Sequence, residues 1–279
     1  MKTILIVIAG MGDLPDPVSL RDTPLATSAT PSLDILAARG DITSFPTVDE
    51  RHELSHKNAL LSILGYDLDR GELSIEELME FGLDSSTPLT AYSSLRPFVI
   101  PGFSGHGICV TTSAWVRGAA KCALLQPVDI YSPGSSDAEI LETMSGLVTE
   151  AVGDNEFIFV YTDTPLKASL RGDFQGKVSA IEQIDRHLVT PIADFVWKSD
   201  LLINMAVTTD LVTTWHRRMP VKLNVPAVLY FNNHDWDGDP NQRFSEVQAM
   251  LMPHYFNVPS DLIRYLCNFY VSDEETAPE

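Results

Sequence analysis

The chain has 279 residues, with 38 acidic and 19 basic side chains and a formal net charge of −19 at pH 7. A hydrophobic fraction of 44% is typical of a globular protein and excludes collagen, coiled-coil and wholly disordered chains. The acidic excess argues against nucleic acid and anionic membranes as partners. Three widely spaced cysteines offer neither a disulfide framework nor a CxxC zinc site, and the longest apolar run, Ile4–Ala9, is too short to cross a bilayer. We therefore expect a cytoplasmic protein.

The first half of the chain contains clear strand and helix signals. Ile4–Ile8 is continuously apolar and β-branched, which predicts a parallel strand buried on both faces in the middle of a sheet. Thr30 as N-cap, Pro31 at the first helical position and Gly40 past the end predict the next helix. A capping box at Ser74–Glu77 predicts a second, shorter helix.

Similar signals continue through the middle of the chain. Gly107–Thr111 is expected to be a strand. Ser136–Glu139 forms another capping box before a helical pattern. Phe157–Tyr161 is expected to be a buried strand. Gly176–Lys198 is predicted to be one amphipathic helix, bent at Pro191.

The last third of the chain completes the pattern. Strands are expected at Leu201–Val207 and Ala227–Phe231, and helices are expected to begin near Phe244 and Ser260. The alternation of strands and helices predicts an α/β fold with a largely parallel central sheet and helices on both faces. Ligands bind such a sheet at the carboxyl ends of its strands. The loops expected to meet there are Ala9–Asp16, Thr162–Asp173 and Thr208–Pro220.

Several further segments carry a resemblance to a known family. They are Ala29–Ala37, Leu61–Asp67, Val116–Lys121 and Gly172–Arg186. In chain order, and together with the three loops, they resemble the archaeal-type cofactor-independent phosphoglycerate mutases of the alkaline phosphatase superfamily. The resemblance implies an alkaline-phosphatase-like core. It also implies a serine nucleophile held between two divalent cations, such as manganese or zinc, because a serine hydroxyl is too weak an acid to ionise unaided.

The positions of the family's metal ligands carry unsuitable residues in this chain. Aligned without gaps, the lost ligands fall on Ala9, Leu166, Leu170, Leu211 and Pro220. Asp210 survives in register, but aliphatic side chains cannot bind a hard cation. The nucleophile position falls on His56, with Ser55 one step away, and no carboxylate is expected beside His56 to orient it.

The resemblance also implies a large cap domain that this chain lacks. Only about forty residues separate Asp67 from the strand at Gly107, so we expect the cap insert to be reduced to roughly 68–106. Without a lid, water would be hard to exclude from a phosphoryl intermediate. We expect a single domain over residues 1–271 and a disordered acidic tail over 272–279.

Three hypotheses follow for function. The favoured one is a non-catalytic protein that has lost metal-dependent phosphotransfer, needs no metal, and binds a partner protein or a small anionic ligand. The second is a phosphatase or phosphomutase that acts on a small phosphorylated metabolite through a rebuilt manganese or zinc site. That site would use Asp13, Asp163, Asp210 and His216. The third is a homo-oligomer with an apolar interface. That interface would use Leu166, Leu170 and Leu211.

The ligand-binding candidates include a basic segment. His216, Arg217 and Arg218 form the densest basic segment and are expected at the ligand-binding edge of the sheet, near Asp13 and Asp210. They could hold an anion, or they could form a salt-bridged surface loop. Other charged residues match the family pattern but are equally explained by helix solubility and capping. These are Arg117, Lys121, Lys177, Asp185 and Arg186.

Overall fold

The computed structural model describes most of the chain. The described residues are 1–70, 73–84, 87–88, 106–130, 133–234, 238–252 and 256–268. The expected acidic tail and part of the expected reduced insert lie outside these ranges. The domain boundaries and the tail therefore stay predictions.

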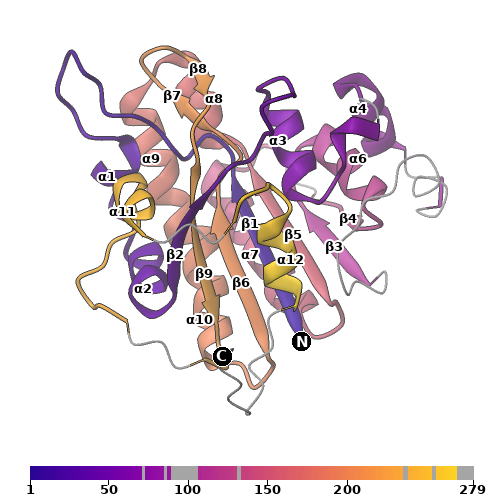
Figure 1. Ribbon diagram of the computed structural model, residues 1–279. Helices are drawn as coiled ribbons and strands as arrows, with labels where there is room; N and C mark the ends of the chain where they lie inside the picture. The colour runs from indigo at the N-terminus through magenta and orange to yellow at the C-terminus, as the bar shows by residue number, and fades with distance from the viewer. Residues whose placement is uncertain are drawn as a thin grey trace, which may run out of the picture.

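The core of the fold is a seven-stranded sheet in the order β2-β9-β6-β1-β5-β3-β4 (Figure 1). β1 (Lys2–Ile8) lies at its centre and pairs in parallel with β5 (Phe157–Thr162) and β6 (Ile203–Thr208). The other strands are β2 (Asp41–Phe45), β3 (Gly107–Val110), β4 (Gln126–Val128) and β9 (Val225–Phe231). The prediction that the first apolar run is a central buried strand is confirmed.

Helices cover both faces of the sheet, as predicted (Figure 1). Ile4 and Ile6 of β1 face one core cluster, whereas Leu5 and Val7 face the other, because successive strand residues point to opposite faces. The first face is covered by α2 (Pro31–Arg39), α7 (Asp137–Ala151), α9 (Phe174–Ile184) and α10 (Thr190–Lys198). The second is covered by α3 (His56–Ile63), α6 (Ala114–Cys122) and α12 (Asp261–Asn268). None of the helices in the described ranges is long and apolar enough to cross a membrane.

The helices begin directly after the predicted N-cap residues, although the Thr30 side chain makes no capping hydrogen bond. α2 begins at Pro31, directly after Thr30. α4 (Ile75–Leu83) begins after the reciprocal capping box of Ser74, and α7 begins after that of Ser136. Capping interactions of this kind join residues within one helical turn, so they can be predicted from the sequence. The remaining short helices are α1 (Pro24–Thr27), a 3-10 turn at Leu68–Arg70 and α11 (Glu246–Leu251).

The single helix predicted over Gly176–Lys198 is interrupted. A π-helical segment, Asp185–Val189, joins α9 to α10. The backbone N–H of Thr190 donates to the carbonyl of Asp185, and the Thr190 hydroxyl donates to the same oxygen at 2.8 Å. Pro191 has no N–H to continue the regular hydrogen-bond ladder, and the wider π-helical turn lies directly before it.

The loop expected over Thr162–Asp173 is mostly helical, so that prediction was wrong. α8 spans Thr164–Arg171. Pro165 lies in its first turn, and Gly172 ends it in the left-handed conformation with a φ of 74°. This is the usual placement of proline and glycine at the two ends of a helix, and it was a sequence signal that we did not use.

The loop expected over Thr208–Pro220 contains an antiparallel hairpin, a second correction. Its strands are β7 (Val212–Thr214) and β8 (Met219–Val221). This connection carries no crossover helix, and β9 accordingly runs antiparallel to β6. β2, which pairs antiparallel with β9 at the edge of the sheet, was not predicted.

Candidate functional site

The carboxyl edge of the sheet brings together three segments that are far apart in sequence. The loop Gly10–Asp13 follows β1, Asp210 follows β6, and His56 opens α3. The backbone N–H of Thr213 donates to Gly12 O at 3.0 Å and the Gly10 N–H donates to Asp210 Oδ1 at 3.1 Å. Hydrogen bonds therefore connect the β1 loop to the start of the hairpin.

His56 and Asp210 form a close pair at this edge. Nδ1 of His56 lies 2.6 Å from Oδ2 of Asp210, and the two residues are 154 positions apart in sequence. The Asp210 side chain is fully buried and that of His56 is 18% exposed. The other ring nitrogen, Nε2, lies 3.2 Å from Thr213 Oγ1. The expectation that no carboxylate orients His56 was wrong, because the partner comes from a distant strand.

Ser55 is the N-cap of α3. Its hydroxyl oxygen accepts a hydrogen bond from the Asn58 N–H at 3.2 Å, which satisfies one of the free donors in the first turn. The side chain that meets Asp210 is thus His56, the first helical residue, and not the serine before it.

Asp13 and Lys177 form a second pair, and both side chains are fully buried. Lys177 Nζ donates to Asp13 Oδ2 at 2.7 Å, to Thr213 O at 2.9 Å and to Gly12 O at 3.1 Å. Burial lowers the pKa of the Lys177 ammonium, and the adjacent Asp13 carboxylate opposes that shift. The α9 lysine therefore holds the β1 loop and the hairpin together.

Helix solubility does not explain several of the charged residues that match the family pattern. Lys121 is buried and donates to the carbonyl oxygens of Phe81, at 2.7 Å, and Asp84. Asp185 is buried and accepts the Leu33 N–H at 2.9 Å in the first turn of α2. Burial raises the pKa of the Asp185 carboxyl to about 6. Like Lys177, these groups join one element of the fold to another.

Glu246, the first residue of α11, extends the cluster around Asp13. Its Oε1 accepts the Asp13 N–H at 2.9 Å, and its Oε2 accepts the Thr23 hydroxyl at 2.8 Å. Burial raises the pKa of this carboxyl to about 7, although Lys177 nearby favours the ionised form. Glu246 thereby ties α11 to the loop after β1.

We expect Glu246 to make the stability of the protein depend on pH. Its folded-state pKa of about 7 lies above the ordinary 4.5, so the folded protein binds more protons than the unfolded chain between these values. The free energy of unfolding should therefore fall as the pH rises from 4.5 to 7, by at most about 3 kcal/mol. Urea unfolding at several pH values measures this. Glu246→Gln should reduce the slope and leave the smaller part that the raised pKa of Asp185 causes, and an unchanged slope in that variant would contradict the assignment.

The basic segment lies in the turn of the β7–β8 hairpin. Arg217 and Arg218 are exposed, whereas His216 is half-buried and its Nδ1 has no hydrogen-bond partner among the described residues. Just before this segment, the backbone N–H of Trp215 donates to Asp13 Oδ2 at 3.1 Å. The segment is thus adjacent to the Asp13 cluster, as expected, and its binding of an anion stays a prediction.

Three of the four residues of a rebuilt metal site are paired with other side chains, whereas Nδ1 of the fourth, His216, has no hydrogen-bond partner among the described residues. Asp13 is paired with Lys177, Asp210 with His56, and Asp163 with Lys167 at 2.8 Å. Within the ranges that the structure describes, no three His, Cys, Asp or Glu residues lie where they could hold a metal ion. These residues do not fit a centre with two manganese or zinc ions.

The leucines at the former ligand positions do not share one surface. Leu211 is 1% exposed and packs with Val48 and Ala59, and Leu166 is half-buried. Only Leu170 is exposed, at 50%. The prediction of one interface formed by these three residues is therefore wrong. Self-association through another surface stays untested.

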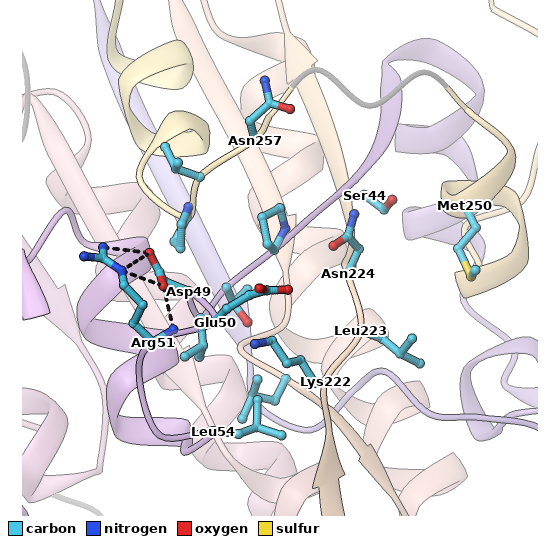
Figure 2. A pocket seen from close by; sticks show the side chains of 16 residues that line it. Ser44, Asp49, Glu50, Arg51, Leu54, Lys222, Leu223, Asn224, Met250 and Asn257 are labelled. Carbon is cyan, nitrogen blue, oxygen red and sulfur yellow. Dashed lines mark hydrogen bonds and ion pairs between the residues drawn. The ribbon is translucent and has the colours of Figure 1, made fainter.

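A cavity of about 800 Å³ lies beside Leu211 (Figure 2). Its walls come from the β2–α3 connection, the β8–β9 turn, the end of α11 and the segment before α12. The apolar wall residues include Val48, Leu54, Leu211, Leu223, Met250 and Val258. Sequence analysis missed this cavity because its walls come from separate segments, none of which carries a motif.

Comparison with known proteins supports the resemblance. The chain matches no family model. The 2,3-bisphosphoglycerate-independent phosphoglycerate mutase of Aeropyrum pernix is 25% identical over 127 residues, which cover 44% of this chain and 30% of that protein. That of Pyrobaculum islandicum is 30% identical over 135 residues, covering 48% and 31%. The relatives are cofactor-independent phosphoglycerate mutases. The match spans only about 30% of the length of these mutases.

Solved structures show the same fold. The PH0037 protein from Pyrococcus horikoshii superimposes with a TM-score of 0.67 at 20% identity, covering 89% of this chain and 90% of its own. The cofactor-independent phosphoglycerate mutase from Thermoplasma acidophilum gives 0.61 at 15% identity, covering 96% and 98%. At these identities the likeness shows the fold alone, and it confirms the mutase-like α/β core expected from the sequence.

Proposed function

We propose that this mutase-like chain has lost metal-dependent phosphotransfer and acts by binding a ligand at the carboxyl edge of its sheet, without a metal cofactor. One observation carries the proposal. Asp13 and Asp210, the carboxylates that follow β1 and β6 at this edge, are paired with Lys177 and His56, side chains of the same chain.

The pairing leaves little capacity for a divalent cation. Both oxygens of Asp13 accept hydrogen bonds, Oδ1 from the Leu14 N–H at 2.7 Å and Oδ2 from Lys177 and Trp215. A metal ion at Asp13 would have to displace a buried ammonium, and separating a buried ion pair is strongly unfavourable. A hard cation also needs several oxygen ligands, and within the described ranges no three His, Cys, Asp or Glu residues lie where they could hold one together.

The cavity beside Leu211 favours a small ligand over a partner protein. Its volume of about 800 Å³ lies in the range of sites for small molecules. Leu211 follows Asp210 directly and contributes to the cavity wall, so the cavity adjoins the carboxyl edge where the mutase resemblance places the reaction.

We also infer a cytoplasmic location, with neither nucleic acid nor membranes as partners. The net charge of −19 supports this, because polyanions are repelled. Cys109 and Cys122 are buried and form no disulfide, and burial raises the pKa of the Cys109 thiol, which keeps it protonated and unreactive.

A turnover assay tests the loss of phosphotransfer. Purified protein with manganese, zinc or magnesium is expected to release no phosphate from p-nitrophenyl phosphate and to produce no isomer of 3-phosphoglycerate. Turnover that needs metal, disappears with chelator and falls at least tenfold in Asp210→Asn would contradict the proposal. That result would restore the alternative, a metal-dependent phosphatase or phosphomutase.

A further inference from the structure

We propose that the cavity beside Leu211 binds a small amphipathic monoanion, with an apolar aliphatic or aromatic body and one carboxylate or sulfonate group, and that Lys222 contacts that group. This inference rests on the proposed function, since it names the site and the class of ligand that a binding role requires.

The cavity offers an apolar body both a floor and a rim. Val48 and Leu211 are buried in its wall. Around the same cavity, Leu223 is 39% exposed, Val258 45% and Met250 57%. Single exposed apolar residues are common on protein surfaces, but three around one cavity form a patch that an apolar ligand would remove from water.

The charged residues of the wall favour a single negative charge on the ligand. Arg51 is already paired with Asp49 and Asp69, each at 2.9 Å. Lys222 is exposed, lines the cavity and makes neither a hydrogen bond nor an ion pair within the part of the chain that the structure describes (Figure 2). It can therefore receive an anion without giving up another contact.

Glu50 limits the negative charge that a ligand in the cavity can carry. It also lines the cavity, is exposed, and has no cationic partner in the described ranges. One free ammonium can neutralise only one negative charge, so the second charge of a phosphate dianion would stay unpaired near the Glu50 carboxylate. The cavity is thus unsuited to the phosphorylated substrates that the mutase resemblance suggests.

Uncharged polar groups in the wall can orient the ligand. Thr47 is 2% exposed, and its hydroxyl has no hydrogen-bond partner among the described residues. The carboxamides of Asn224 and Asn257 line the same cavity. A few hydrogen-bonding groups in a mainly apolar wall are typical of small-molecule sites.

Two fluorescent dyes with one aromatic body separate the apolar contribution from the charged one. 1-Anilinonaphthalene-8-sulfonate carries a sulfonate, and N-phenyl-1-naphthylamine lacks it. Titration of the folded, full-length chain should show saturable binding of both dyes at one site per chain. Lys222→Glu should weaken the sulfonate dye at least tenfold and the neutral dye less than twofold. Met250→Ser should weaken both dyes about fivefold through lost apolar contact.

Matched variants away from the cavity control for charge and hydrophobicity. Lys198→Glu replaces a lysine of α10 with a 77% exposed side chain, and Met79→Ser replaces a 43% exposed methionine of α4. Neither residue lines the cavity, and neither variant should change the affinity for either dye. Thermal unfolding without dye checks that each variant is folded before its titration is compared.

Competition identifies the body of the ligand. Decanoate and 2-naphthoate are expected to displace the sulfonate dye. The competitor that binds more tightly shows whether the site prefers an aliphatic or an aromatic ligand body. 3-Phosphoglycerate is expected not to displace it. Failure of both monocarboxylates, or dye affinities unchanged by Lys222→Glu and Met250→Ser, would overturn this site while leaving the proposed function intact. Metal-dependent turnover would instead overturn the proposed function.

Discussion

Replacing Lys177 with Met is expected to lower the free energy of unfolding by about 3–5 kcal/mol. The variant leaves the carboxylate of Asp13 buried without its cation, and it leaves the carbonyls of Gly12 and Thr213 without the ammonium donor. An uncompensated buried charge is among the most destabilising changes that one substitution can make. Urea unfolding followed by circular dichroism measures the difference.

Lys198→Met is the matched control, because this side chain is 77% exposed. It should change the free energy of unfolding by less than about 0.5 kcal/mol. If Lys177→Met cost no more than this control, the buried pair would not hold the carboxyl edge together as we describe.

Asp210→Ala should destabilise the protein by about 3 kcal/mol or more, since it removes the acceptor of four hydrogen bonds worth about 1–3 kcal/mol each when left unmade. The donors are the Gly10 and Leu211 N–H groups, at 3.1 and 2.7 Å, the ring of His56 at 2.6 Å and, at 3.5 Å, the Thr209 hydroxyl. Thermal and chemical unfolding both report this loss.

Asp210→Asn refines this prediction. Asparagine keeps one oxygen for the backbone donors, and its amide can donate to Nδ1 of His56 if the ring proton moves to Nε2, which faces Thr213 Oγ1 at 3.2 Å. Its cost should therefore be less than half that of Asp210→Ala. Asp194→Ala, in α10, is the neutral control, because this side chain is 49% exposed and its ion pair with Lys198 lies at the surface. Equal losses for Ala and Asn would show that hydrogen bonding at Asp210 is not what stabilises this edge.

Elements with local signals were predictable from the sequence. The capping boxes of Ser74 and Ser136 and the apolar run of β1 depend on neighbouring residues alone. Gly172 and Pro165 carried a comparable signal for α8, which the loop prediction over Thr162–Asp173 left out of account.

The pairs at the carboxyl edge could not be read from the sequence. Asp210 and His56 are 154 positions apart, and Asp13 and Lys177 are 164 apart. Lys177 did carry a weak signal, because it lies on α9 directly beside Val178, within the buried face of that helix. The ammonium group of a lysine at such a position either reaches solvent or is paired in the interior. Only the fold decides between these two outcomes.

The resemblance predicted the fold better than the site. It implied the positions where metal ligands would be lost, and in the structure Asp210, which aligns with one of the family's ligands, is paired with a histidine. A leucine at the position of a ligand can be recognised in an alignment. The pairing of Asp210 with His56 could be predicted only from knowing which residues meet in space.

Metal occupancy tests the central claim most directly. Protein purified without chelator, incubated with manganese and zinc and then freed of unbound ions by gel filtration, should contain near-zero bound metal by elemental analysis. Stoichiometric manganese or zinc, lost in Asp210→Asn, would contradict the account, because it would show that the carboxylates at this edge leave Lys177 and His56 to hold a metal ion.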